Sequence, residues 1–144
     1  MSDIKIRKIK QSDFKDIFEL NCDLGYEYPK EKTEQRIRYI LENTEDVILV
    51  AESGGEVVGY IHGSPYELLY SDSLMNVLGL VIKEKVRRSG IGHLLITELE
   101  NIAKEKAFMG IRLVSGYNRI HAHKFYEKHG YINRKDQKNF IKLI

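Results

Sequence analysis

"VIKEKVRRSGIGHLLITELE" (residues 81–100) decides the fold, because an apolar strand, a charged glycine turn and an amphipathic helix follow one another in it. The first amides of such a helix lack partners inside it, and the helix dipole makes its start electropositive. Arg87 and Arg88 add donors suited to phosphate, while Gly90 and Gly92 let a ligand approach the backbone. The pattern indicates an anion-binding turn, although two glycines so spaced could also serve only to shape a tight turn.

Two common phosphate-binding motifs are excluded at this turn. The dinucleotide fingerprint needs a third glycine where Leu95 stands. A P-loop needs Gly-Lys-Ser/Thr, but Gly92 is followed by His93 and Leu94. The turn therefore indicates a phosphate-bearing ligand that is held by neither of these motifs.

Composition favours an ordinary soluble domain. The chain has 144 residues, 42% hydrophobic and 31% charged, which predicts a single domain over residues 1–144. A net charge of +2 gives no reason to expect a nucleic-acid partner. No apolar run approaches the ~20 residues that span a bilayer, and the start has no apolar signal core. With the single cysteine, Cys22, these features predict a cytoplasmic protein without a membrane partner.

The remaining chain alternates strand and helix patterns in the order βααβββαβαβ. Strands are predicted over 4–9, 46–52, 56–63, 74–82 and 111–117, helices over 14–20, 32–42, 91–103 and 118–130, and two short strands within 131–144. Strand 74–82 is apolar nearly throughout, which is typical of a central strand. The order predicts an α/β fold with a parallel crossover over 74–116.

Three blocks of this sequence resemble the GCN5-related N-acetyltransferase (GNAT) superfamily. Arg87-x-x-Gly90-x-Gly92 resembles its acyl-CoA pyrophosphate loop, "VAESGGEVVGYIHG" (50–63) its hairpin, and "LVSGYNRIHAHKFYEKHGYI" (113–132) its later strand and helix. The blocks occur in the expected order and cover nearly the whole chain. The resemblance implies a mixed, mostly antiparallel twisted sheet of six to seven strands. It also implies about four helices on both faces and a central parallel pair splayed to hold CoA.

The resemblance also implies where acetyl-CoA, the cosubstrate, would bind. Its pantetheine arm would pair with the backbone edge of Leu80, Val81 and Ile82. Its pyrophosphate would meet the backbone amides of residues 88–92, and Asn118 would reach the arm from the neighbouring strand. The loop residues so implied are Arg87, Arg88, Ser89, Gly90, Ile91 and Gly92. No metal is expected, because His121 and His123 are two residues apart on a helix and point away from each other.

Acetyl transfer to an amine requires a neutral amine and a leaving thiolate that can be accommodated. An alkyl ammonium is only about one part in a thousand neutral at pH 7, so deprotonation costs roughly 4–5 kcal/mol. The resemblance places Tyr126 as the acid for the thiolate, although the same side chain could simply pack the helix face. The common glutamate base is replaced by Asn76. The remaining candidates for a base are Glu27, Glu67, Asp72 and His62.

The resemblance implies an acyltransferase (class EC 2.3.1) that moves an acetyl group from acetyl-CoA directly to a primary amine of a small molecule. Loops 24–31 and 63–73 combine tyrosines with carboxylates, which suits a cationic acceptor, although those tyrosines could equally cover the core edge. Two alternatives stay open: a protein or peptide N-acetyltransferase, and a non-catalytic CoA-binding regulatory module. A homodimer could form through the C-terminal "NFIKLI" (139–144).

Overall fold

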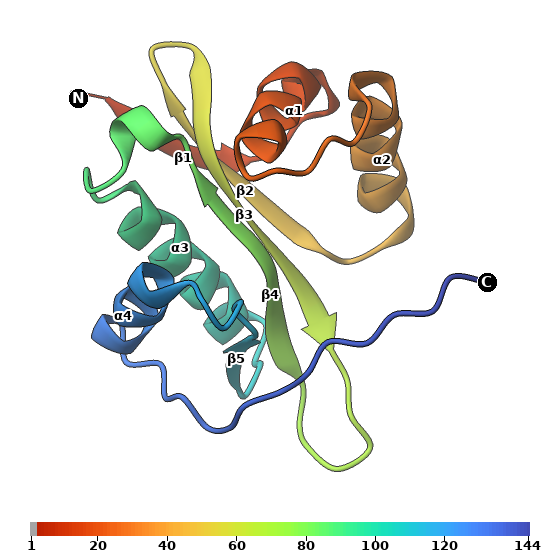
Figure 1. Cartoon of the computed structure of the whole chain (residues 1–144), viewed down its shortest axis with the longest axis vertical. Helices are drawn as coiled ribbons and strands as arrows, with labels where there is room; N and C mark the ends of the chain where they lie inside the picture. Colours follow the sequence, from red (N-terminus) through yellow and green to blue (C-terminus); the bar gives the residue numbers. More distant parts are fainter. Residues whose placement is uncertain (1–2) are drawn as a thin grey trace. The chain divides into compact units, whose positions relative to one another are not determined.

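The structure, a computed structural model, describes residues 3–144 in two compact units, one ending at Leu113 and the other spanning Val114–Ile144. Figure 1 traces the elements of both units along the chain. The prediction of one domain over residues 1–144 stays a prediction.

The first unit is built on a five-stranded sheet whose spatial order follows the chain, β1–β2–β3–β4–β5. Neighbouring strands are antiparallel up to β4, and β4 and β5 are parallel. The strands are β1 Ile4–Lys8, β2 Val47–Ser53, β3 Glu56–Tyr66, β4 Leu74–Ile82 and β5 Gly110–Leu113. The predicted parallel crossover is confirmed, because α3 (Ile91–Glu105) connects the two parallel strands.

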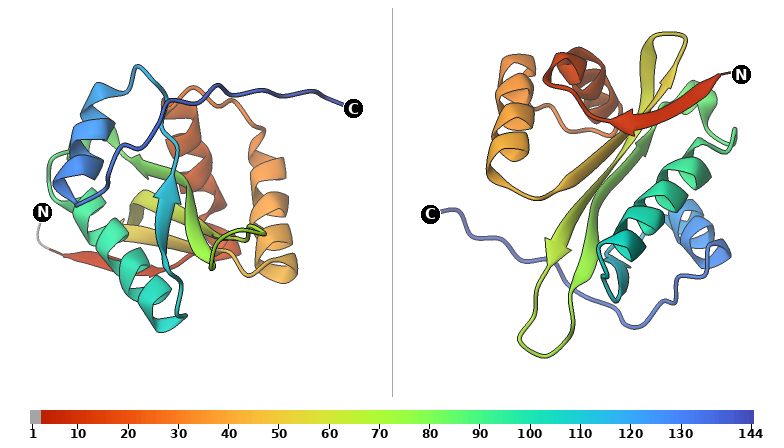
Figure 2. Two further views of the ribbon diagram at one scale, coloured as in Figure 1. Left: turned by 90° about the horizontal axis from the view of Figure 1, so that it is seen from below. Right: turned by 180° about the vertical axis from the view of Figure 1, so that it is seen from behind.

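Helices cover both faces of this sheet, as predicted. Figure 2 shows α1 (Phe14–Asp23) and α2 (Lys30–Asn43) on one face and α3 on the other. Ile17 of α1 and Ile37 of α2 join Ile48 and Val81 of the sheet in one apolar cluster. Two short 3-10 turns, η1 Gln11–Asp13 and η2 Glu84–Val86, complete the unit.

The α3 face of the sheet depends on a close approach at Gly63 of β3. A β-carbon there would lie 2.8 Å from Met75 Sδ and 3.0 Å from Leu99 Cδ1. Both of those side chains are fully buried, Met75 on β4 and Leu99 on α3. The buried residues of α3 recur at helical spacing and are Ile91, Leu95, Ile96, Leu99 and Ala103.

The second unit contains one helix, α4 (Ile120–Lys128), which ends before Gly130 with its left-handed φ of 89°. Residues 131–144 form no strand, and the apolar side chains of 140–144 are exposed. The prediction of six to seven strands is therefore wrong for residues 3–144, which contain five. A strand exists only as the partner of another, and no strand of the sheet pairs with this segment.

The predicted strand 111–117 is also shorter than expected. β5 ends at Leu113, where its pairing with β4 ends. Asn118 therefore lies in a turn before α4 and not at the end of a strand.

Replacing Gly63 by alanine should destabilise the protein through overpacking. The added methyl group meets two fully buried side chains that have little room to move, so we expect a loss of about 1–3 kcal/mol in the free energy of unfolding. The measurement is urea unfolding followed by circular dichroism.

Gly79→Ala on β4 is the matched control for this substitution. Its β-carbon would lie near only one side-chain atom, Tyr60 Cε1, at 3.9 Å. Equal losses for the two variants would contradict the packing explanation.

Candidate active site

Strand β4 loses one of its two neighbours partway along its length. Its parallel ladder with β5 covers four residue pairs and ends at the Val77–Leu113 pair. On its other side β4 continues to pair with β3 as far as Ile82. Among residues 3–144, the segment Leu78–Ile82 has no strand on its β5 side, so its backbone edge is open (Figure 1).

A β-bulge lies where the two parallel strands part. His62 of β3 opposes Gly79, and the next residue, Gly63, opposes Val77, so Leu78 is an extra residue in β4. Bulges bend and twist the strand that carries them, which turns β4 away from β5. The sequence analysis missed this bulge. Its signal is Gly79, a glycine inside an otherwise apolar strand.

The open edge presents the backbone groups of alternate residues. The amide of Lys83 donates to the carbonyl of Val58 at 2.8 Å, so Lys83 faces β3. Because the direction alternates along a strand, Val81 also faces β3, whereas Leu80 and Ile82 direct their N–H and C=O groups to the open edge. Val81 instead contributes a side chain to the core and is 4% exposed.

The turn before α3 carries a series of unpaired backbone donors. Gly90 precedes the helix with a φ of 88°, and no side chain caps this end. Its carbonyl accepts the first helical hydrogen bond, from the amide of Leu94. Within the part of the chain that the structure describes, none of the amides of residues 88–92 donates to a protein acceptor. Such a cluster of amides at a helix start is suited to an anion.

Side chains and backbone strain hold this turn in shape. Arg87 Nε donates to the carbonyl of Ile82 at 3.3 Å, which ties the turn to the open edge. The hydroxyl of Ser89 donates to the carbonyl of Val86. Arg88 has a φ of 69°, a conformation that non-glycine residues rarely adopt. Strained backbone of this kind is concentrated at functional sites, because it positions successive amides toward a ligand.

Polar side chains follow the β3–β4–β5 part of the sheet on the face that carries α1 and α2. They alternate with apolar side chains that point to α3, as the pleat requires. We call them the polar row: Tyr60, His62, Ser64 and Tyr66 of β3, Asn76 of β4 and Arg112 of β5. This face lies beside the open edge and is the candidate surface for an acceptor.

Tyr60 marks the end of the polar row nearest to α1. Its hydroxyl donates to Asn21 Oδ1 at 2.6 Å. Burial raises the pKa of Tyr60 to about 12, and the neighbouring Tyr26 contributes in the same direction. Tyr60 therefore stays a neutral hydrogen-bond donor and does not act as a base at neutral pH.

His62 forms a pair that the sequence analysis did not anticipate. Its Nε2 lies 2.7 Å from Asp46 Oδ2, and the two side chains are 17% and 11% exposed. The hairpin register creates the pair, because His62 opposes Ile48, two residues after Asp46. No local sequence pattern predicts the His62–Asp46 pair. The carboxylate fixes the orientation of the imidazole and leaves Nδ1 for another partner.

The position of the common glutamate base is occupied by a bonded amide. Asn76 Oδ1 accepts a hydrogen bond of 2.9 Å from Arg112 Nη1. An amide cannot take a proton from an ammonium, and this one is already held by a cation. Asn76 therefore orients its neighbours on the polar row and is not a base.

The three carboxylates that were candidates for a base are less favourably placed than His62. Glu67 accepts hydrogen bonds from Ser73 Oγ at 2.7 and 3.0 Å. Glu27 and Asp72 are exposed in their loops. Exposure lets water compete for these groups, which favours the half-buried His62 as the base.

The second unit holds the two remaining site residues. The ring of Tyr126 packs edge-on against Phe125 and Tyr131, with centroids 5.5 and 6.0 Å away. Burial raises the pKa of Tyr126, which Arg119 only partly opposes. Asn118 is exposed, and its carbonyl accepts a hydrogen bond from the amide of Ile120.

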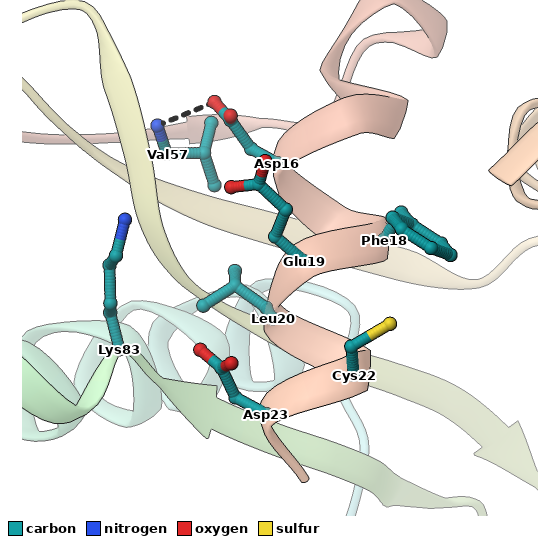
Figure 3. A pocket seen from close by; sticks show the side chains of 8 residues that line it. All are labelled: Asp16, Phe18, Glu19, Leu20, Cys22, Asp23, Val57 and Lys83. Atoms are coloured by element: carbon teal, nitrogen blue, oxygen red, sulfur yellow. Dashed lines mark hydrogen bonds between the residues drawn. The ribbon is translucent and has the colours of Figure 1, made fainter. Parts of the chain in front are cut away.

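A separate pocket of about 290 Å³ lies where α1 faces the ends of β3 and β4 (Figure 3). One of its carboxylates, Asp16, accepts a hydrogen bond of 3.0 Å from the amide of Val57. Lys83 pairs with Glu56. The lining residues are Asp16, Phe18, Glu19, Leu20, Cys22, Asp23, Val57 and Lys83. This pocket is shaped by the docking of α1 on the sheet and contains no residue of the predicted site.

Among residues 3–144, no group of three or more histidine, cysteine, aspartate or glutamate side chains is arranged to hold a metal ion. None of the described helices has the length and hydropathy that a membrane crossing requires.

Comparison with solved structures finds the same fold in known proteins. The chain is similar over its full fold to a transcriptional regulator from Bacillus halodurans C-125, with 21% identity, 97% and 100% of the two chains covered and a TM-score of 0.87. It is also similar to glucosamine-6-phosphate N-acetyltransferase from Arabidopsis thaliana, with 21% identity, 97% and 99% of the two chains covered and a TM-score of 0.83. A third similar structure is that of the aminoglycoside 6'-N-acetyltransferase AAC(6')-Ih from Acinetobacter baumannii, with 20% identity, 99% of each chain covered and a TM-score of 0.84.

A search of curated proteins finds no match. The family model for the acetyltransferase (GNAT) family matches residues 12–131, which is most of the chain. The resemblance in sequence is thus confirmed, and the chain belongs to the acetyltransferase (GNAT) family.

Proposed function

We propose that this chain is an acetyl-CoA-dependent N-acetyltransferase that moves an acetyl group directly to a primary amine of a small molecule. The observation that carries the proposal is the combination of two features in the first unit. One is the cluster of unpaired amides over residues 88–92, and the other is the open edge of β4. Members of this family use acetyl-CoA, which has groups that match both features.

The residues present fit acetyl-CoA. A pyrophosphate matches the amides at the start of α3 together with the charges of Arg87 and Arg88. The amide groups of a pantetheine arm match the N–H and C=O groups of Leu80 and the N–H group of Ile82 at the open edge, whereas the carbonyl of Ile82 accepts from Arg87. The hydrogen bond from Arg87 to Ile82 joins the two features, so one elongated ligand can use both.

Acetyl-CoA supplies an activated acyl group as a thioester. The protein must then remove a proton from the acceptor ammonium, which costs roughly 4–5 kcal/mol at pH 7 without help. We assign this task to His62. With Nε2–H donated to Asp46, its Nδ1 keeps a lone pair that can accept the proton.

Tyr126 is proposed as the acid that protonates the leaving thiolate. Burial raises its pKa, so the hydroxyl keeps its proton at every pH at which the enzyme would work. The proposal rests on this property and on the family pattern at the helix that carries Tyr126.

A second candidate function is a CoA-binding regulatory module. Two observations favour it: Asn76 stands in place of the usual carboxylate, and one structural neighbour is named a transcriptional regulator. Transfer to a protein or peptide amine is a third candidate function. Cytoplasmic location and a homodimer stay predictions.

The test is a thiol-release assay with acetyl-CoA and a panel of amines. The panel contains amino acids, aminophosphonates, amino sugars, polyamines, aminoglycosides and peptides. Turnover with a small amine is expected. Turnover with peptides alone would favour the third candidate function, and tight acetyl-CoA binding without turnover would favour the regulatory module.

Gly92→Glu should abolish acetyl-CoA binding without unfolding the protein. A carboxylate in the first turn of α3 is compatible with the helix dipole and is worth about 0.3–1 kcal/mol of stability there. The same charge repels a phosphate, so the dissociation constant should rise by about 100-fold or more. Calorimetry measures binding, and Gly92→Ala is the control without a charge. Unchanged affinity of the Glu variant would refute the proposed phosphate site.

Tyr126→Phe should lower kcat by about 100-fold while leaving acetyl-CoA binding nearly unchanged. Because the folded protein raises the pKa of this phenol above its ordinary value of 10, the group loses its proton only at still higher pH. The ratio of wild-type to variant rates should therefore stay constant from pH 6 to pH 9. A ratio that falls toward 1 within this range would remove Tyr126 from the acid role.

His62→Gln should lower kcat/KM at pH 7 by about 100-fold. This loss should shrink as the pH approaches 10, because the acceptor amine then becomes neutral without a base. Asp46→Asn should show a smaller loss with the same pH trend. A loss that is equal at all pH values would indicate that the pair only supports the hairpin.

A further inference from the structure

Arg112 occupies a special place on the polar row. It lies on β5 opposite Asn76, one residue before the parallel strands part. Its Nη1 donates to Asn76 Oδ1 at 2.9 Å, and its guanidinium carbon lies 4.5 Å from the centre of the Tyr66 ring. Since Tyr66 belongs to β3, the arginine side chain extends across β4 on the face that carries the polar row.

The charge of Arg112 has no acidic partner. Among residues 3–144, no carboxylate oxygen lies within 4.0 Å of its guanidinium, and both of its partners are neutral. Arg7 in the same sheet shows the usual arrangement, with Asp13 at 2.9 Å and Glu52 at 2.8 Å. The acid of the adjacent loop, Glu67, accepts its hydrogen bonds from Ser73.

This arrangement leaves most of the guanidinium donors available. Of its five N–H groups, one is used by Asn76. The stacking on Tyr66 and the bond to Asn76 hold the plane of the group, so little side-chain entropy is lost when a ligand binds. A fixed, half-buried guanidinium with free donors is suited to a bidentate contact with an oxyanion.

Arg112 and the proposed base, His62, lie on the same face of the sheet. The Asn76–Arg112 pair and the His62–Gly79 pair are separated by the bulge on β4 and are two residues apart along β3, which corresponds to roughly 7 Å of strand. Both pairs direct side chains to the same face. One acceptor that carries both an amine and an anionic group could therefore contact His62 and Arg112 on this face.

We propose that Arg112, oriented by Asn76 and Tyr66, forms an anion subsite, and that the acceptor is an amine that also carries an oxyanion such as a carboxylate, phosphate or phosphonate. The proposal rests on the proposed function and names its substrate class. It separates this chain from enzymes for polycationic acceptors, because an unpaired arginine on the acceptor surface repels a molecule with several ammonium groups.

The first experiment compares matched acceptors in the thiol-release assay. Each set of three shares an amine and a chain length and consists of an aminoalkylphosphonate, an amino acid and the corresponding amino alcohol, which lacks the oxyanion. Wild-type kcat/KM should be at least about 10-fold higher for an anionic member than for the alcohol. The two anionic arms show whether the subsite prefers phosphonate or carboxylate. Equal values for all three would overturn the proposal.

Variants of Arg112 test whether this residue is the cause. Arg112→Gln should raise KM for the anionic acceptor about 10- to 100-fold, with kcat and the KM of the amino alcohol little changed. Arg112→Lys keeps the charge and should recover part of the loss. The matched control is Arg36→Gln on α2, which removes an exposed arginine stacked 4.8 Å from Tyr39 and should change neither constant. An equal loss for all acceptors with Arg112→Gln would overturn the proposal.

A binding measurement separates this subsite from the amide cluster over residues 88–92 and from catalysis. Methylphosphonate is titrated into ¹⁵N-labelled protein, and the amide signals of β5 are followed. Shifts that Arg112→Gln removes and Gly92→Glu retains are expected. If no amine is turned over while these shifts persist, the proposed function fails and the anion subsite stands. If anionic and uncharged amines react equally and the shifts are absent, the subsite fails and the function stands.

Discussion

The candidate site depends on a mismatch between the two ladders of β4. The strand pairs with β3 along its whole length, but with β5 over only its first four residues. The extra residue at Leu78 produces this mismatch, because a bulge redirects the strand and ends the parallel pairing. Every other feature of the first unit's candidate site takes its position from this point. The open edge begins there, the turn over residues 88–92 follows its end, and the polar row flanks it.

Successive side chains of β3 and β4 point to opposite faces of the sheet, so packing against α3 and contacts with a ligand involve different residues. One set of residues of β3 and β4 packs against α3, where Gly63 admits Met75 and Leu99 at close range. The other set includes Val81, which packs in the apolar cluster with α1 and α2, and the polar row, which begins at Tyr60 beside α1. Val81 belongs to the core, and its neighbours Leu80 and Ile82 offer backbone groups at the edge. Stability and ligand contacts thus use different atoms of the same strand, which lets the acceptor surface vary while the core stays unchanged.

Much of the fold was predictable because it follows from periodicity. The strand 74–82 was predicted with its observed bounds, and the α3 pattern predicted both the helix and its buried face. The turn over residues 88–92 was recognisable from local spacing as a candidate anion site. Features that arise from pairing between distant segments were not predictable from the sequence. The His62–Asp46 and Arg112–Asn76 contacts depend on strand register, and the C-terminal strand patterns lack a partner strand among residues 3–144.

The open segment Leu78–Ile82 also has a consequence for the protein in a crowded cell. Unpaired strand edges are templates for association with other chains, and this one carries Leu78 with 56% of its surface exposed. The bulge at one end and the charged Lys83 and Glu84 at the other limit the edge to five residues. A ligand that pairs with this edge also covers it. Supply of such a ligand would then affect how soluble the protein is, quite apart from any turnover.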